Sequence, residues 1–204
     1  KHFLGFDTLQ RAVITAVKEA VDNSLDACEE ARILPTIKVE INKLKADKLE
    51  LICQDNGPGI PRNSVENVFG KFLLGSRFHA IRQTRGQQGI GITGVVMYSQ
   101  LTTGSKTHVI SKIKSDSSAV HVDLGLDTRK NKATKSNEIR DVWFEDGEEV
   151  VSGLKIKTVM KAKYQRGRQS VHQYLRMTSI VNPHATIQLI VRDADGEIID
   201  RGHW

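Results

Sequence analysis

Apolar residues along the chain follow two different periods, one helical and one extended. Over residues 9–31 they recur every three or four positions, which predicts a long amphipathic helix that Pro35 prevents from continuing. Residues 36–41 and 49–55 instead alternate apolar and polar side chains, with a lysine-rich turn between the two runs. This alternation predicts two antiparallel strands that form a hairpin.

The rest of the chain continues both patterns and contains two long polar segments. Residues 75–91 are polar and rich in glycine, and loops of this length in compact domains are often functional lids. Residues 127–141 carry most of the remaining local polarity, which predicts an exposed loop. The other expected elements are helices over residues 64–74, 92–101 and 168–181, and strands over residues 108–113, 119–126, 142–145, 154–160 and 187–192. Together they predict an α/β fold, a two-layer sandwich with a mixed, mostly antiparallel sheet and helices on one face.

Composition narrows this picture to one ordinary globular domain. The 204 residues are 39% apolar and 26% charged, and no apolar run is long enough to span a bilayer. With no secretory leader visible, a cytosolic protein is expected, in which Cys28 and Cys53 are small buried thiols. The net charge of +6 permits a polyanionic partner, but the basic clusters are short and do not identify one.

Polar residues form a second stripe on the first predicted helix. Glu19, Asn23 and Asp26 are spaced i, i+4 and i+7 and so share one face, whereas Asp22 is offset by one position and expected to point elsewhere. An amide oxygen suits magnesium, and a glutamate one turn away can deprotonate water that attacks a γ-phosphate. A hydrated outer face of the helix explains the same residues equally well.

The second polar segment, Asp55-Asn56-Gly57-Pro58-Gly59, directly follows a predicted strand. Its glycines permit positive φ angles and a close approach of a ligand to the backbone. The Asp55 carboxylate can accept a hydrogen bond from an exocyclic amine. By itself, however, the segment is equally well explained as a tight turn.

The third segment is the glycine-rich stretch from Arg85 to Gly94, at the start of a predicted helix. Closely spaced glycines in this position can present backbone N–H groups to an anion at the positive end of the helix. The stretch lacks the Gly-Lys-Ser/Thr ending of a Walker A loop, and no strand precedes it as a dinucleotide-binding motif requires. For this segment alone, a flexible loop remains the alternative.

Taken together, the three segments resemble the GHKL ATPases, which include gyrase, heat-shock chaperones, histidine kinases and MutL. They occur in the order Glu19-x-x-x-Asn23-x-x-Asp26-Ala27, Asp55-x-Gly57-x-Gly59 and Gly86-x-x-Gly89-x-Gly91. Longer stretches across the whole chain look like the N-terminal ATPase domain of the B subunits of type IIB DNA topoisomerases (topoisomerase VI). These stretches are Phe3-Leu-Gly-Phe-Asp7, Lys18-Glu-Ala-Val-Asp-Asn-Ser-Leu-Asp-Ala-Cys28, Thr84-Arg-Gly-Gln-Gln-Gly-Ile-Gly91, Tyr98-Ser-Gln100 and Val181-Asn-Pro-His184.

The resemblance implies the Bergerat fold and a role for each motif residue. Glu19 would be the general base, Asn23 the magnesium ligand and Asp55 the residue that reads adenine. The residues it implies in ATP binding are Asn23, Asp55, Gly57, Gly59, Ser76, Arg77, Gly86, Gln87, Gln88, Gly89, Ile90, Gly91, Ile92 and Thr93.

Two positions depart from the family pattern. Some relatives have a lysine where Thr93 stands, so a charged phosphate contact is expected to be missing or supplied differently. The family usually has Gly-Thr on a late strand near the adenine, whereas Gly153 is followed here by Leu154. The second change is expected to weaken the adenine side of the pocket.

The resemblance also implies ATP and Mg²⁺ as cofactors and double-stranded DNA as a partner. ATP-dependent dimerisation of B subunits would gate the passage of one duplex through a break made by the A subunit, within an A2B2 heterotetramer. In the family a helical insert and a transducer domain follow this region, so residues 1–204 are expected to be the ATP-binding domain, with little turnover alone. The expected location is cytoplasmic and nucleoid-associated in a prokaryote or nuclear in a eukaryote, without a membrane partner.

Two alternatives accompany this interpretation. The first is a degenerate GHKL scaffold that binds nucleotide without turnover, against which the retention of Glu19, Asn23 and Asp55 argues. The second is a MutL-like or chaperone-like GHKL ATPase. The chain lacks the Gly-Phe-Arg-Gly-Glu-Ala lid of MutL, which disfavours this alternative.

Overall fold

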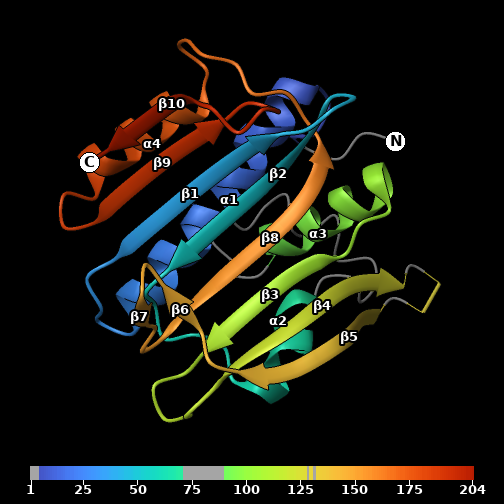
Figure 1. Cartoon of the computed structure of the whole chain (residues 1–204), viewed down its shortest axis with the longest axis vertical. Helices are drawn as coiled ribbons and strands as arrows, with labels where there is room; N and C mark the ends of the chain where they lie inside the picture. Colours follow the sequence, from blue (N-terminus) through green and yellow to red (C-terminus); the bar gives the residue numbers. More distant parts are fainter. Residues whose placement is uncertain (1–4, 71–89, 128, 131) are drawn as a thin grey trace.

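The computed structural model describes residues 5–70, 90–127, 129–130 and 132–204 (Figure 1). Within these residues the chain forms an eight-stranded sheet in the order β10-β9-β1-β2-β8-β3-β4-β5. Its strands are β1 (Thr36–Lys43), β2 (Lys48–Asp55), β3 (Thr107–Lys112), β4 (Ala119–Asp127), β5 (Lys132–Asp141), β8 (Gly153–Lys161), β9 (Thr186–Arg192) and β10 (Ile198–His203). Only β1 and β9 pair in parallel, so the sheet is mixed and mostly antiparallel as predicted.

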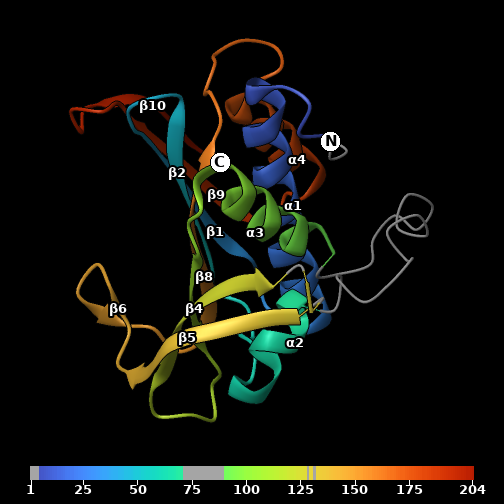
Figure 2. The ribbon, with the colours of Figure 1, turned by 90° about the vertical axis from the view of Figure 1, so that its right-hand side faces the viewer.

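The helices lie on one face of this sheet, and a small hairpin stands on the other (Figure 2). The helical layer consists of α1 (Leu9–Glu30), α2 (Val65–Gly70), α3 (Ile90–Thr103) and α4 (Val171–Val181). The hairpin pairs β6 (Phe144–Glu145) with β7 (Glu148–Glu149). The predicted two-layer α/β sandwich is therefore confirmed for the part of the chain that is described.

The core lies between the long helix α1 and the central strands. Thr8 caps α1 by accepting a hydrogen bond from the Arg11 amide, which satisfies one of the unpaired donors of the first turn. The buried residues of α1 recur along one face as the pairs Ala12/Val13, Ala16/Val17 and Ala20/Val21, followed by Ser24 and Cys28, and alternate residues of β1 and β2 face them. Cys28 and Cys53 are buried thiols within this core, as expected from the sequence.

The two edges of the sheet differ from the sequence prediction. Residues 127–141 were expected to form an exposed loop, but most of them form β5, which pairs antiparallel with β4. The prediction was wrong because an edge strand with polar residues on both faces shows no apolar alternation. For the same reason β10, at the opposite edge, was not predicted at all.

Other element boundaries shift by a few residues. The helix expected over residues 64–74 begins as a 3₁₀ turn, Arg62–Ser64, and continues as α2. Its last expected residues and the glycine-rich segment up to residue 89 lie outside the described residues. The strand expected over residues 142–145 is reduced to the two residues of β6.

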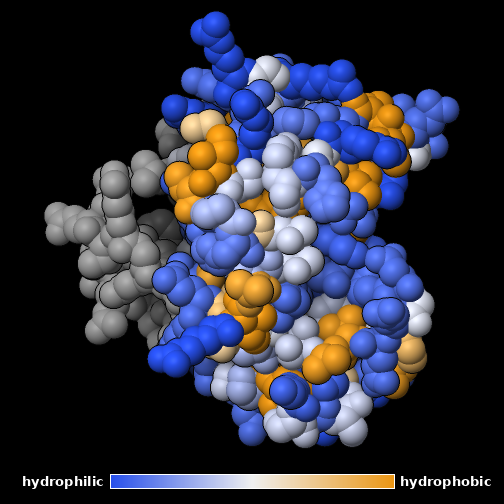
Figure 3. Space-filling view, turned by 90° about the vertical axis from the view of Figure 1, so that its left-hand side faces the viewer, coloured by the Kyte–Doolittle hydropathy of each residue, from blue (hydrophilic) through white to orange (hydrophobic). Residues whose placement is uncertain are grey.

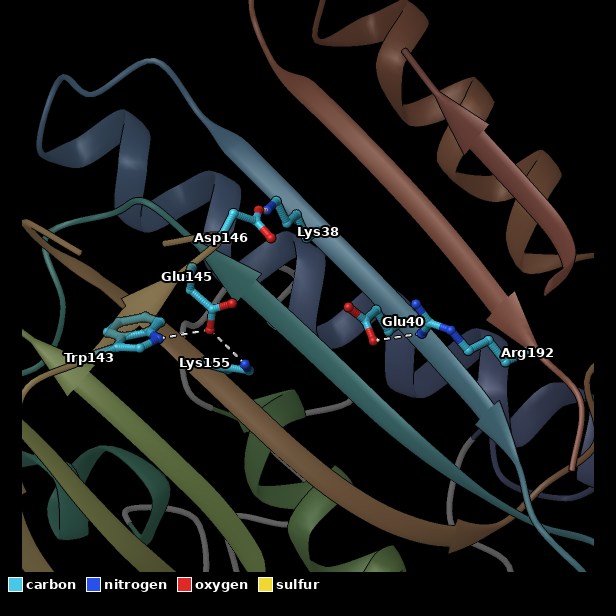
Figure 4. A network of polar contacts seen from close by, with 7 residues as sticks. All are labelled: Lys38, Glu40, Trp143, Glu145, Asp146, Lys155 and Arg192. Carbon is cyan, nitrogen blue, oxygen red and sulfur yellow. Dashed lines mark hydrogen bonds and ion pairs between the residues drawn. The ribbon is translucent and has the colours of Figure 1, made fainter. Parts of the chain in front are cut away.

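The face of the sheet opposite the helices carries ion pairs instead of a second apolar layer (Figure 4). Lys38 of β1 lies 2.8 Å from Asp146 of the hairpin, and Lys155 of β8 lies 2.6 Å from Glu145. The Trp143 indole also donates a hydrogen bond to Glu145, at 2.8 Å. These contacts attach the hairpin to the sheet through charges near solvent.

The surface bears no single large apolar face on the side shown in Figure 3. Hydrophobic residues appear there in several separate patches with hydrophilic residues between them. Among the described residues, no helix combines the length and the apolar character needed to cross a bilayer.

Candidate functional site

A pocket of about 430 Å³ lies between α1 and the segment that follows β2. Its volume falls within the range of about 300–1,000 Å³ that is usual for small-molecule sites. Three predicted residues from two separate motifs, Asn23 from the first and Asp55 and Gly59 from the second, are brought together in its lining. The remaining lining residues are Ala27, Glu30, Ala31, Pro58, Ile60, Pro61, Ser64, Val68 and Leu154.

Asp55 is the most firmly held polar side chain of this pocket, and only 4% of it is exposed. One carboxylate oxygen accepts a hydrogen bond from the Ser24 hydroxyl at 2.6 Å. The other accepts from the backbone N–H groups of Gly57 at 2.9 Å and Leu154 at 3.1 Å. Burial raises the pKa of Asp55, and the three hydrogen bonds oppose this by stabilising the ionised form. A carboxylate has about four acceptor sites, so one remains for a donor on a ligand.

Two of the groups that hold Asp55 were not identified from the sequence. Ser24 lies on the buried side of α1, in line with Val21 and Cys28, and a polar residue within an apolar stripe signals a buried partner. Leu154 was noted as a departure that weakens the adenine side of the pocket. In the structure its backbone amide supports Asp55, a contact that does not depend on the side chain and that the sequence pattern cannot reveal.

The turn after Asp55 reaches past β8 and is fixed to strand β3. Gly59 has φ +73°, and a Cβ atom there would lie 2.2 Å from the Lys112 carbonyl oxygen, so only glycine fits. The Ser111 hydroxyl accepts a hydrogen bond from the Ile60 amide and donates one to the Ile60 carbonyl, both at 2.7 Å. These contacts hold the floor of the pocket against the sheet.

Glu19 lies one turn before Asn23 on α1 and does not itself line the pocket. It is half-buried, and a Cβ atom built on Gly91 would lie only 1.7 Å from a Glu19 carboxylate oxygen. The carboxyl group therefore contacts the first turn of α3, where the helix dipole is positive and a side chain would displace it. This arrangement joins the first and third sequence motifs directly.

Asp22 points away from the pocket, toward helix α4. It is half-buried and accepts a hydrogen bond from the Tyr174 hydroxyl at 3.2 Å, a partner that the sequence did not reveal. Desolvation by burial raises the pKa of Glu19, and the negative charge of Asp22 raises it further. An i, i+3 spacing places residues close enough on a helix for this interaction.

The other residues predicted to contact ATP divide into those that the structure describes and those that lie outside the described residues. Ile92 and Thr93 are buried in α3, and the Thr93 hydroxyl donates a hydrogen bond to the Phe69 carbonyl at 2.6 Å. Ile90 begins α3, and Gly57 contributes its amide to Asp55. The other predicted contacts, Ser76, Arg77, Gly86, Gln87, Gln88 and Gly89, lie outside the described residues.

Residues 8–130 match the family described as histidine kinase-, DNA gyrase B- and HSP90-like ATPases. The chain belongs to this ATPase family. It is 50% identical, over 97% of its length, to the B subunit of type 2 DNA topoisomerase 6 from Archaeoglobus fulgidus. A similar match, 48% over 98% of the chain, is found with the corresponding protein from Methanosarcina acetivorans. In both cases the chain spans 32% of the relative's length.

Solved structures show the same ATPase-family fold at lower identity. The N-terminal domain of a DNA repair protein aligns with a TM-score of 0.56 and 20% identity, over 98% of this chain and 54% of that one. The ATP-binding domain of topoisomerase IV from Francisella tularensis aligns with a TM-score of 0.50 and 13% identity, over 92% of this chain and 84% of that one. These likenesses support the fold alone.

Proposed function

We propose that this chain is the ATP-binding and ATP-hydrolysing domain of a type IIB DNA topoisomerase, within its B subunit. The observation that carries the proposal is the 50% identity to a topoisomerase 6 protein of that kind over 97% of the chain. The structure supports it physically, because the pocket combines a buried acceptor with apolar walls, and a half-buried carboxyl group, Glu19, lies one turn away from its residue Asn23, beside the N-terminus of α3.

Adenine would occupy the end of the pocket at Asp55. The carboxylate has an acceptor site left for the exocyclic amine, and its hydrogen bonds to Ser24 and Leu154 keep it oriented before a ligand arrives. Apolar side chains of Ile60, Val68 and Leu154 line the same pocket and suit the faces of a flat ring.

The phosphates would lie toward Asn23 and the start of α3. Asn23 would hold a magnesium ion through its amide oxygen, and the ion would neutralise charge on the phosphates when bound. A magnesium site of this kind needs few protein ligands, because the ion keeps several waters and shares the rest with phosphate. Gly91 and the predicted residues Ser76, Arg77 and Gly86–Gly89 would surround the triphosphate, with Ile90, Ile92 and Thr93 supporting that segment.

Glu19 would act as the general base of hydrolysis. Its carboxylate would take a proton from a water whose oxygen attacks the γ-phosphorus, while the bond from that phosphorus to the leaving ADP oxygen breaks. A pKa raised by burial and by Asp22 favours this role, because a base works best when its pKa approaches the working pH.

In the complete protein, ATP binding would bring two B subunits together and gate the passage of one DNA duplex through a break made by the A subunit. Double-stranded DNA and an A2B2 heterotetramer belong to this proposal, as do the further domains that would follow residue 204. Two observations support it: the relatives are themselves B subunits, a designation that implies a partner, and the chain spans only 32% of their length.

The first test replaces the proposed base. In the full-length protein with its A subunit and DNA, Glu19→Gln should bind ATP as the unmodified protein does but lose turnover by about 10²–10⁴-fold. Glu50→Gln, on the open face of the sheet beside Lys157, is the matched control and should keep full turnover. Unchanged turnover in Glu19→Gln would contradict the assignment of Glu19 as the general base.

A second test addresses the metal. Asn23→Ala should reduce the dependence of nucleotide affinity on magnesium, measured by titrating a non-hydrolysable ATP analogue with and without the ion. If magnesium strengthens binding equally in both proteins, Asn23 is not the ligand. Absence of ATP-stimulated strand passage despite tight ATP binding would favour a nucleotide-binding scaffold instead.

A further inference from the structure

The floor of the pocket is a turn with no regular backbone pairing of its own. It consists of four consecutive residues that all line the pocket: Pro58, Gly59, Ile60 and Pro61. None of them lies in a helix or a strand, and the two prolines have no backbone N–H group to donate. The shape of the floor therefore depends on partners from other parts of the fold.

Ser111, in strand β3, supplies these partners with a single side chain. Its hydroxyl oxygen accepts a hydrogen bond from the Ile60 N–H group, and its O–H group donates one to the Ile60 carbonyl, both at 2.7 Å. A hydroxyl can do both because it has one donor and two acceptor sites. Among the described residues, no other hydrogen bond holds residues 58–60. Ser111 itself is only 2% exposed and does not line the pocket.

The position of β3 within the sheet explains why a side chain makes this connection. Strand β3 lies between β8 and β4 and pairs with both, so its backbone groups are used within the sheet (Figure 1). Thr107, Val109 and Ser111 are the alternate residues of β3 that share one face, and all three are buried. A buried hydroxyl in such a row requires a hydrogen-bond partner, and the Ile60 peptide groups provide it.

We propose that Ser111 is a positioning residue for the adenine of ATP: it fixes the peptide groups of Ile60, and with them the floor of the pocket, before the nucleotide binds. The inference rests on the proposed function, because it takes ATP as the ligand of this pocket. A floor that is already ordered binds a flat base more tightly, since less conformational freedom is lost on binding. Both hydrogen bonds of Ser111 go to the floor, so Ser111 acts on nucleotide affinity and not on the chemical step.

The test is Ser111→Ala in the full-length protein with its A subunit and DNA. The Kd for ADP, measured by isothermal titration calorimetry, should rise by about tenfold, which corresponds to the loss of about one net hydrogen bond. The KM for ATP should rise by a similar factor while kcat stays unchanged, as expected when binding is lost equally from the ground state and the transition state. The factor by which magnesium strengthens nucleotide binding should stay that of the unmodified protein.

Ser99→Ala is the matched control. Ser99 is fully buried in α3, and its hydroxyl also donates to a backbone carbonyl, that of Val159 at 2.5 Å, but Val159 does not line the pocket. The control variant should lose thermal stability and keep the Kd for ADP and the KM for ATP of the unmodified protein. An unchanged Kd in Ser111→Ala, or an equal rise of Kd in both variants, overturns the inference.

A second measurement needs no variant and so does not depend on the folding of Ser111→Ala. In the unmodified protein without nucleotide, the Ile60 amide should exchange its hydrogen far more slowly than the amide of Ser117, an exposed residue between β3 and β4. Equally fast exchange at the two amides overturns the inference. If the unmodified protein binds neither ADP nor ATP, the proposed function fails instead, whatever the exchange rate of Ile60.

Discussion

The two carboxyl groups of the candidate site are held in different ways. Asp55, which lines the pocket, is almost completely buried and accepts three hydrogen bonds, from Ser24, Gly57 and Leu154. Glu19, one turn before Asn23 on α1, is half-buried, and burial and a like charge raise its pKa with no hydrogen bond acting on it from the described residues. Asp55 is fixed by the fold, whereas Glu19 is held mainly by packing against Gly91.

This difference fits the two tasks proposed for the pocket. A residue that recognises a base benefits from a fixed geometry, because affinity is lost when groups must be ordered on binding. For a carboxyl group that acts as a general base, surroundings that disfavour its ionisation are useful, because they raise its pKa toward the working pH. The comparison predicts that substitutions at the Asp55 end cost stability, whereas substitution of Glu19 does not.

The largest expected effect is that of Asp55→Ala. The change leaves the Ser24 hydroxyl and the amides of Gly57 and Leu154 without their buried acceptor, so the free energy of unfolding of this chain should fall by about 3–5 kcal/mol. Urea denaturation measures it. Glu197→Ala removes an exposed carboxylate from the turn between β9 and β10 and should leave the unfolding midpoint almost unchanged. Equal losses of unfolding free energy in Asp55→Ala and in its control would contradict the conclusion that the fold depends on Asp55.

A smaller loss is expected for Ser24→Ala. One oxygen of Asp55 then loses its donor while remaining buried, which should cost about 1–3 kcal/mol of unfolding free energy. ATP affinity should also weaken, because the orientation of Asp55 depends on this contact. Ser179→Ala, at an exposed site on α4, is the matched control and should change stability by less than about 0.5 kcal/mol. A Ser24→Ala variant as stable as its control would show that the other two donors suffice.

The sequence predicted the parts of the fold in which local pattern and burial agree. Helix α1 and the β1–β2 hairpin were found within two residues of their observed ends, because one face of each is continuously apolar. The edge strands β5 and β10 were missed because backbone pairing to one neighbouring strand holds them in place. Such pairing does not require alternating apolar and polar side chains, so the sequence shows no strand pattern there.

The candidate site, like the fold, was predicted only in part. Spacing left each motif with a second explanation, and it was the resemblance to the GHKL ATPases that assigned Asn23 and Asp55 to one site; both line the same pocket in the structure. Spacing could not reveal the Leu154 amide, which has no sequence signature, or Tyr174, which comes from a distant helix. The offset of Asp22 from the polar face was predicted, but its partner on α4 was not, because spacing along one helix says nothing about which other helix packs against it.

The smallest expected effect concerns Glu19 and has the opposite sign: a gain of stability instead of a loss. The pKa of Glu19 in the folded protein is raised above its ordinary value of 4.5, so its contribution to stability is complete below that value and is lost as pH rises through the folded pKa. Glu19→Gln, which does not ionise, should therefore gain stability relative to the unmodified protein between about pH 4 and pH 7, by less than Ser24→Ala loses. Urea denaturation at both pH values measures the difference. If Glu19→Gln instead became relatively less stable toward neutral pH, partners in the fold would stabilise the ionised form of Glu19, as the three hydrogen bonds do for Asp55 against the opposing effect of its burial, and the two carboxyl groups would not differ in the way proposed.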